Sequence, residues 1–283
     1  MILERMIFMI KLTNLKIDGE GWAYTALPTL VSLGDCWDYN SFLRSIRHLL
    51  LDTNIDKRDF EMEETDMSEP ILSDVLSHTD VLCIATQLKD EQEIKSLQIM
   101  VDLAVKNNVR YIAIMLCNTK SRNHEQEQAL SRLKGQVNAI IDFAGYNSIS
   151  NGQVNNAVSC IVRAIFAPHI FMGIIGLDLE DLRSGIKEHD VAIAAIVKET
   201  IHHGFEEKIL QAATEQIYMQ HRDLRQAHNV YFAVFGNENT IGIGTLQEIL
   251  PGAMENNVVS ATIDNAMKDE EVLVVTIASG FKK

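Results

Sequence analysis

The sequence predicts an α/β protein in three parts: an N-terminal domain built on a parallel sheet (residues 1–150), a central core helix with an acidic loop after it (151–183), and a smaller α+β domain (184–283). Three observations support this division. Short apolar runs alternate with helix-like spacing between residues 80 and 143, which is typical of βαβ units. Residues 151–167 are apolar around most of a helical circumference, which is typical of a helix buried between other layers. Beyond them, helical patterns come first and strands follow, which favours an α+β arrangement.

Composition excludes several classes of protein. Hydrophobic residues make up 47% of the 283 residues and charged residues 23%, so the chain can bury a sizeable core in each of two domains. The formal net charge of −14 would repel a nucleic-acid backbone, and no basic patch offsets it, so we expect no nucleic-acid partner. No apolar run is long enough to cross a membrane.

The cysteines and histidines predict neither a disulfide framework nor a metal site. The four cysteines are far apart and mostly lie in apolar runs, as expected of reduced core residues in a cytoplasmic protein: Cys36, Cys83, Cys117 and Cys160. Glu199, His202 and His203 have the spacing of one helical face. Histidines in a last helical turn are favoured by the helix dipole alone, and no further ligand is evident.

The first 79 residues are the least informative part of the chain. A first strand is predicted at residues 7–12, and residues 22–33 and 39–51 have helical or mixed patterns. Gly19 and Gly21 lie between two such segments, where a phosphate loop is one interpretation. The neighbouring carboxylates carry the wrong charge for phosphate, so an ordinary turn is favoured.

From residue 80 onward the pattern predicts an open parallel sheet. Strands are expected at 81–85 and 111–116, with a helix at 91–106 between them. A polar helix at 124–133 and a short apolar segment at 137–143 continue the alternation. Ligands bind such sheets at the carboxyl ends of the strands, so the loops after the two strands are the expected pocket.

The central helix and the C-terminal domain follow. Pro168 is expected to end the helix, and an apolar run then leads to the acidic loop at residues 176–183. In the C-terminal domain, the pattern predicts helices at 187–203 and 206–220, a strand at 229–235, a helix that opens at Thr245 in a capping box with Glu248, and strands at 258–264 and 272–278.

Three segments of the chain resemble the FtsZ/tubulin superfamily, specifically FtsZ. The acidic loop lies where that family has its N-x-D-x-x-D loop, and both aspartates match, at Asp178 and Asp181. Residues 274–281 (VVTIASGF) are similar to the family's closing strand, V-T-V-x-A-T-G-F. Residues 80–116 align without a gap with the strand, phosphate loop, helix and strand of the nucleotide domain. The resemblance covers residue 80 to the C-terminus and implies a Rossmann-like nucleotide domain, a central core helix and an FtsZ-type α+β domain.

The phosphate loop departs from the family's pattern. The glycine-rich signature G-G-G-T-G-T-G is replaced here by Lys89, Asp90, Glu91, Gln92, Glu93, Ile94 and Lys95. Side chains block the close approach of backbone to phosphate that glycines allow. The D-x-x-E spacing of Asp90 and Glu93 predicts a helix start capped by its own carboxylates. A triphosphate would meet like charge, at about 1 kcal/mol per close pair in water and about 4 near a protein surface. We therefore expect GTP and GDP binding to be lost or weak.

The acidic loop has two interpretations. The resemblance implies that Asp178 and Asp181 would orient the attacking water on the nucleotide of the next subunit, because the family hydrolyses GTP between subunits. Gly176 replaces the family's asparagine. The alternative is that both aspartates only cap the next helix. No residue is expected to be catalytic on its own.

The hypothesis that follows is an FtsZ-like protein that acts by self-association or by association with a genuine FtsZ, as a regulator of cell division or of the cytoskeleton. The sequence ends two residues after Phe281, without the family's tail, so no membrane tether is expected. One alternative is a diverged filament-forming GTPase that holds nucleotide through Lys89, Lys95 and the Gly19/Gly21 turn. Another is a scaffold or small-molecule-binding module that reuses the fold.

Overall fold

The computed structural model describes residues 10–14, 28–33, 62–64, 69–117, 122–143, 151–170, 173–186, 191–202, 205–220, 222–242, 245–246, 257–265 and 267–281. Several predicted features lie outside these residues: the start of the first strand, the Gly19/Gly21 turn, the pattern at 39–51, and most of the helix that opens at Thr245.

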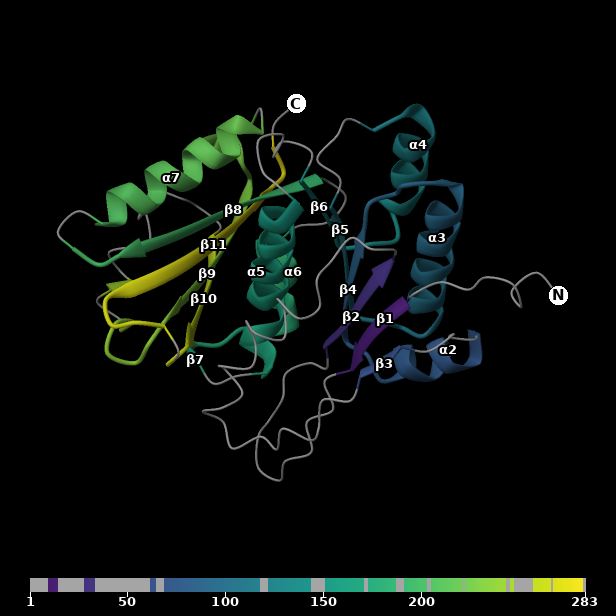
Figure 1. Cartoon of the computed structure of the whole chain (residues 1–283), viewed down its shortest axis with the longest axis horizontal. Helices are drawn as coiled ribbons and strands as arrows, with labels where there is room; N and C mark the ends of the chain where they lie inside the picture. Colours follow the sequence, from purple (N-terminus) through teal and green to yellow (C-terminus); the bar gives the residue numbers. More distant parts are fainter. Residues whose placement is uncertain are drawn as a thin grey trace, which may run out of the picture.

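One continuous sheet runs through the described part of the chain (Figure 1). Its eleven described strands follow the order β3-β1-β2-β4-β5-β6-β8-β11-β9-β10-β7. They are β1 (Ile10–Asn14), β2 (Pro28–Leu33), β3 (Met62–Glu64), β4 (Val81–Thr86), β5 (Tyr111–Leu116), β6 (Ala139–Asp142), β7 (Gly173–Ile175), β8 (Val191–Thr200), β9 (Asn229–Gly236), β10 (Asn257–Ile263) and β11 (Glu271–Ser279). The helices are α2 (Glu69–Ser77), α3 (Glu91–Lys106), α4 (His124–Leu133), α5 (Asn151–Ile170), α6 (Leu179–Gly185) and α7 (Phe205–Met219), with a 3₁₀ turn at Leu224–Gln226.

The parallel half of the sheet consists of β2, β4, β5 and β6, which pair in parallel. Helices α2, α3 and α4 cover one face and α5 covers the other (Figure 1). Because both faces are covered, β4 and β5 are buried along their whole length and are apolar almost throughout. The prediction from residue 80 onward is confirmed in this half: α3, β5 and α4 have the expected bounds, and β4 is one residue longer.

The mixed half consists of β8, β11, β9, β10 and β7, in which β9 and β10 pair in parallel and the other pairs are antiparallel. Helix α7 covers the face that points away from α5 (Figure 1). Strands β9, β10 and β11 and helix α7 lie within one or two residues of their predicted bounds. This is the α+β arrangement that the sequence predicts.

Two predicted helical segments are wrong. The helix expected at 187–203 is strand β8, and residues 28–33, expected as helical or mixed, form β2. Alternate residues of β8 face opposite layers: Ala192 and Ala194 pack in the cluster around α5, while Ile193, Ala195 and Val197 pack in the cluster around α7. A strand covered on both faces has no polar alternation, and its small residues resemble a helix in sequence.

Helix α5 continues through Pro168 to Ile170, so the prediction that this proline ends the helix is also wrong. A proline inside a helix removes the hydrogen bond to the carbonyl four residues earlier, here Ala164. The hydroxyl of Tyr231 donates to that carbonyl at 2.6 Å and also lies 2.8 Å from Ser260 Oγ. The strand β9 thus supplies the donor that Pro168 lacks, and α5 is tied to the mixed half.

The described cysteines are free, as predicted. Cys83 and Cys117 are buried and Cys160 is half-buried. Burial raises the pKa of Cys83 and of Cys160, so both thiols stay protonated at neutral pH. Within the described ranges, no helix combines the length and apolarity that a membrane span needs.

The two halves of the sheet meet where β6 pairs with β8. The register joins Ile140 to Val191 and Ile141 to Ala192, which is the shortest parallel ladder among the described strands. Helix α5 packs against strands of both halves in one apolar cluster and so lies across this joint (Figure 1).

Candidate functional site

The β4–α3 loop lies at the carboxyl end of β4, where the sequence predicts a pocket of the parallel sheet. Leu88 has a φ of +54°, a left-handed conformation that is costly for a residue with a Cβ. Helix α3 begins after Asp90, whose side chain accepts a hydrogen bond from the backbone N–H of Glu93 at 2.9 Å. The loop therefore has a tight turn followed directly by a capped helix.

The carboxylate of Glu93 fills this loop. One oxygen accepts from Thr86 Oγ1 at 2.7 Å and from the N–H of Gln87 at 2.8 Å, and the other accepts from the N–H of Lys89 at 2.7 Å. The intervening N–H, of Leu88, donates to Thr86 Oγ1 at 3.1 Å. Glu93 is only 8% exposed. All three backbone donors of the turn are therefore engaged within the chain.

This arrangement corrects one detail of the predicted cap. Asp90 caps the helix as its spacing predicts, but Glu93 turns back into the β4–α3 loop and binds the amides of Gln87 and Lys89. That these amides correspond to the phosphate-binding donors of the family stays a prediction. The seven-residue segment thus contains a carboxylate bound by backbone amides, which is the kind of contact a helix N-terminus offers to an anionic ligand.

The other residues of the segment are on or near the surface. Lys95 pairs with Glu91 across one helical turn at 2.5 Å, both side chains being largely exposed. This pair lowers the pKa of Glu91 through its hydrogen bond and charge. Gln92 and Lys89 are exposed, and Ile94 is half-buried. The Lys89, Lys95 and glycine set of the alternative GTPase hypothesis is not brought together in the described residues, because its glycines lie outside them.

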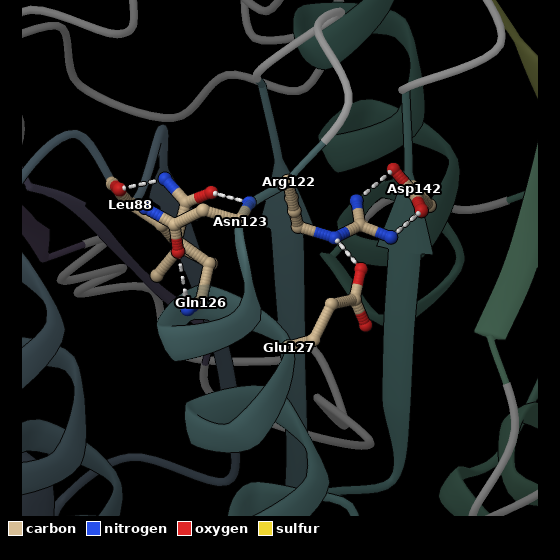
Figure 2. A network of polar contacts seen from close by, with 6 residues as sticks. All are labelled: Leu88, Arg122, Asn123, Gln126, Glu127 and Asp142. Carbon is tan, nitrogen blue, oxygen red and sulfur yellow. Dashed lines mark hydrogen bonds and ion pairs between the residues drawn. The ribbon is translucent and has the colours of Figure 1, made fainter.

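The next loop is joined to the first (Figure 2). The side-chain amide of Gln126, at the start of α4, donates to the carbonyl of Leu88 at 2.6 Å. Gln126 and Asn123 also form a reciprocal capping box, with distances of 2.9 and 2.8 Å. The carbonyl that Leu88 presents in its left-handed turn is thus held by the helix of the neighbouring strand–helix unit.

A buried cation completes this edge of the sheet (Figure 2). Arg122 makes a two-point ion pair with Asp142 at the end of β6, at 2.8 and 2.7 Å, and its Nε donates to Glu127 at 2.7 Å. Burial acts to lower the pKa of Arg122, but the hydrogen bonds and charges of Asp142 and Glu127 outweigh it and raise that pKa. The carboxyl ends of β4, β5 and β6 are therefore linked by polar contacts within the chain.

The acidic loop caps helix α6. Asp178 accepts from the N–H of Asp181 at 2.8 Å, and Asp181 accepts from the N–H of Asp178 at 3.1 Å. Both side chains are exposed. A Cβ added at Gly176 would meet nothing within 4 Å, so packing does not require a glycine there. The capping interpretation describes the contacts of this chain, while a role on the nucleotide of another subunit stays a prediction.

His169 connects the end of helix α5 to the acidic loop. It is 3% exposed, lies in the last turn of α5 and is hydrogen-bonded to the backbone of Leu177. Burial lowers the pKa of His169 to about 4, against the opposing charge of Asp178. The ring is therefore neutral at physiological pH, and it joins the end of the central helix to the loop.

The histidine set considered as a metal site is arranged differently from the prediction. Glu199 lies in strand β8 and His202 follows the strand, so the two do not share a helical turn. His202 Nε2 is 3.8 Å from Glu199 and 3.0 Å from the ammonium of Lys208. His203 lies outside the described residues. Among those described, no group of three or more potential metal ligands occurs.

Sequence reasoning missed Arg122, Asp142, Gln126 and His169. Only Gln126 had a usable signal, because N-x-x-Q before a helical pattern has the spacing of a capping box. Arg122 and Asp142 are 20 residues apart and meet because Arg122 lies between β5 and α4, and Asp142 ends β6, the neighbour of β5 in the sheet.

Solved structures show what the fold is similar to. The chain matches an FtsZ W319Y mutant from M. jannaschii with a TM-score of 0.58 and 16% identity, over 77% of this chain and 70% of that one. It matches an empty FtsZ dimer from M. jannaschii with a TM-score of 0.53 and 15% identity, over 74% and 66%. It matches a GTPγS-bound protofilament of CetZ2 from Haloferax volcanii with a TM-score of 0.52 and 8% identity, over 72% and 66%. No family model and no curated protein matches the sequence.

These matches, with the sheet order and the central helix, define the class: the chain has the FtsZ/tubulin-like fold. The fold that the resemblance predicts is confirmed, from a Rossmann-like parallel sheet through the core helix to the α+β half. The solved structures that it matches include a dimer and a protofilament.

Proposed function

We propose that this chain is an FtsZ/tubulin-like subunit that has lost GTP binding and hydrolysis and acts by association, with copies of itself or with a genuine FtsZ-type filament. The observation that carries the proposal is the seating of the Glu93 carboxylate on the amides of Gln87 and Lys89. A cytoplasmic regulator of cell division or of the cytoskeleton is the role that fits such a subunit.

The energetics of the loop oppose a bound triphosphate. A phosphate at this position would have to displace Glu93 and break its three hydrogen bonds, each contributing about 1.5–3 kcal/mol for a charged acceptor. If a phosphate displaced Glu93, the carboxylate and the phosphate would still be two like charges near one helix N-terminus. No glycine in the segment lets the backbone move closer to compensate.

Association is supported by the fold and by its neighbours. One solved structure similar to this chain is an FtsZ dimer described as empty, and another is a protofilament. A subunit whose own loop is filled would offer no nucleotide to the next subunit. Added to a genuine FtsZ filament, it would cap the end that needs that nucleotide.

Nucleotide binding tests the first part of the proposal. The purified protein is checked for bound nucleotide and then titrated calorimetrically with GTP and GDP, with and without Mg²⁺. We expect affinity of millimolar or weaker and no co-purified nucleotide. Micromolar binding, or GDP retained through purification, would contradict the proposal and favour a diverged GTPase.

Association is tested separately. Sedimentation velocity of the protein alone gives its self-association, and light scattering of a polymerising FtsZ-type protein gives its effect on filaments. We expect self-association that GTP does not change, or a loss of scattering at equimolar ratio. A monomer at all concentrations, together with unchanged scattering, would sink the association hypothesis and leave a binding module that reuses the fold.

A further inference from the structure

The contacts of Glu93 extend beyond its own loop. Its two carboxylate oxygens bind the amides on either side of Leu88, so a single group holds that residue in its left-handed turn. Such a conformation is unfavourable for a residue with a Cβ and persists only where surrounding contacts determine it. This left-handed turn directs the carbonyl of Leu88 toward Gln126, whose side-chain amide donates to it at 2.6 Å.

Gln126 connects the β4–α3 loop to the start of helix α4. Its side chain binds Leu88 and Asn123, and its backbone N–H is capped by the Asn123 side chain. Arg122, the residue before that cap, is paired with Asp142 on β6. A series of short contacts therefore runs from Glu93 across the carboxyl ends of three neighbouring strands. Figure 2 shows the part of this series from Leu88 to Asp142.

The position of the carboxylate is that of a ligand. Glu93 is 8% exposed and lies in the first turn of a 16-residue helix. Its carboxylate accepts from the N–H groups of Gln87 and Lys89, which would otherwise lack this acceptor. An anion in that position is favoured by the helix dipole and by the amide cluster together. The difference from an external phosphate is that this anion cannot dissociate.

We propose that Glu93 is a built-in ligand that holds the β4–α3 loop and the start of α4 in one closed arrangement at all times. This inference rests on the proposed function and adds its regulation: the face that would dock a neighbouring subunit is set by a covalently attached carboxylate, so association neither waits for nucleotide nor is released by hydrolysis. Lys89 and Asp90 in the loop before α3 and Glu125 in the first turn of α4 are exposed charges whose backbone this arrangement holds.

Amide hydrogen exchange of the full-length chain tests the inference, with Glu93→Gln as the variant. Glutamine keeps the shape of the side chain, but it loses the charge and places an NH₂ donor against one of the loop's donors. In the wild type without nucleotide, we expect protected amides at Gln87 and Lys89. In Glu93→Gln, we expect at least about tenfold faster exchange at both and at the amide of Gln126.

The matched control is Glu91→Gln, which lies in the same helical turn but is exposed and pairs only with Lys95. We expect less than about twofold change there. Unchanged exchange in β9 and β11 shows that both variants are folded. Fast exchange at Gln87 and Lys89 in the wild type, or no effect of Glu93→Gln, would overturn the inference. An effect confined to these two amides would overturn its extension to α4.

The same samples separate this inference from the proposed function. If the wild type binds GTP at micromolar concentration, or associates only when GTP is added, the proposed function fails whatever the exchange shows. If association is independent of nucleotide but Glu93→Gln leaves both exchange and association unchanged, the inference fails alone. The proposed function and the inference are both supported if Glu93→Gln shows faster amide exchange in the two loops and about tenfold weaker association. Glu91→Gln must show neither change.

Discussion

Two loops of this protein carry the same local motif and use it differently. The β4–α3 loop contains Asp90 and Glu93, and the acidic loop contains Asp178 and Asp181, each pair three residues apart at a helix start. In both, the first aspartate accepts from the N–H of the second acid, at 2.9 and 2.8 Å. The contact made by the N-cap aspartate is therefore the same in both loops.

The second acid makes the difference. Asp181 reaches back to the N–H of Asp178 and stays exposed, so its contacts are local. Glu93 is one methylene longer, is buried, and binds donors of the preceding turn, including Thr86 at the end of β4. One motif thus ends as a surface cap and the other as a buried carboxylate bound to the preceding turn. Burial and the shape of the preceding turn decide between them.

Removing the second acid should separate the two loops most clearly. Glu93→Ala leaves the amides of Gln87 and Lys89 without their acceptor in a largely buried turn, so we expect a loss of about 3 kcal/mol in the free energy of unfolding. Asp181→Ala removes one exposed contact and should cost about 0.5 kcal/mol. Urea denaturation of both variants measures the difference, and equal losses would remove the distinction.

Breaking the ion pair between Arg122 and Asp142 should have the next largest effect on the free energy of unfolding. Arg122→Met leaves Asp142, whose side chain is 13% exposed, without its cation, and we expect a loss of about 2 kcal/mol. A double-mutant cycle with Asp142→Asn isolates the pair from the general cost of each substitution. A coupling below about 0.5 kcal/mol would mean that the pair is only a surface contact.

The acidic loop should be sensitive to pH through His169. Its folded pKa of about 4 lies below the ordinary value of 6.5. Between these values the unfolded state binds more protons, so stability falls as the pH falls through this window and is unaffected above it. At pH 5 the loss from this group is about 2 kcal/mol relative to pH 7.

The check compares the wild type with His169→Asn, which cannot take up a proton. Urea denaturation at pH 7 and pH 5 gives the loss of stability in each, and carboxylate titration contributes equally to both. The variant should lose about 2 kcal/mol less than the wild type. Parallel losses would show that the ring is accessible to protons in the folded state.

Removing either N-cap aspartate should have a smaller effect on the free energy of unfolding, and the two losses should be similar. Asp90→Ala and Asp178→Ala each remove an N-cap, so each should cost about 1 kcal/mol. Similar values in urea denaturation would place the whole difference between the loops in the second acid. A much larger loss for Asp90→Ala would mean that its cap also positions Glu93.

Most of the fold could be predicted because its strands and helices have clear lengths. The helix Glu91–Lys106 and the strand Tyr111–Leu116 were predicted to the residue. Strand β8 could not be, because alanines fill both of its buried faces and remove the alternation that identifies a strand. The length of α5 depended on Tyr231, a residue 67 positions from the carbonyl that it satisfies.

The candidate site could be predicted only where its contacts are local. The caps at Asp90 and Asp178 follow from spacing, and the structure shows both. The use of Glu93 as an acceptor depends on the left-handed turn at Leu88. No residue type in the loop predicts that conformation. Contacts of this kind belong to the folded sheet, and local patterns carry no information about them.

The short joint between β6 and β8 gives the molecule an uneven stiffness. Most ladders within each half are longer, whereas in the described residues the halves are paired through Ile140 and Ile141 with Val191 and Ala192. What bridges them is the apolar contact of α5, and apolar surfaces can slide a little without leaving a polar group unpaired. A force pulling the two halves of the sheet apart would therefore be taken up first at this joint, and each half would keep its shape.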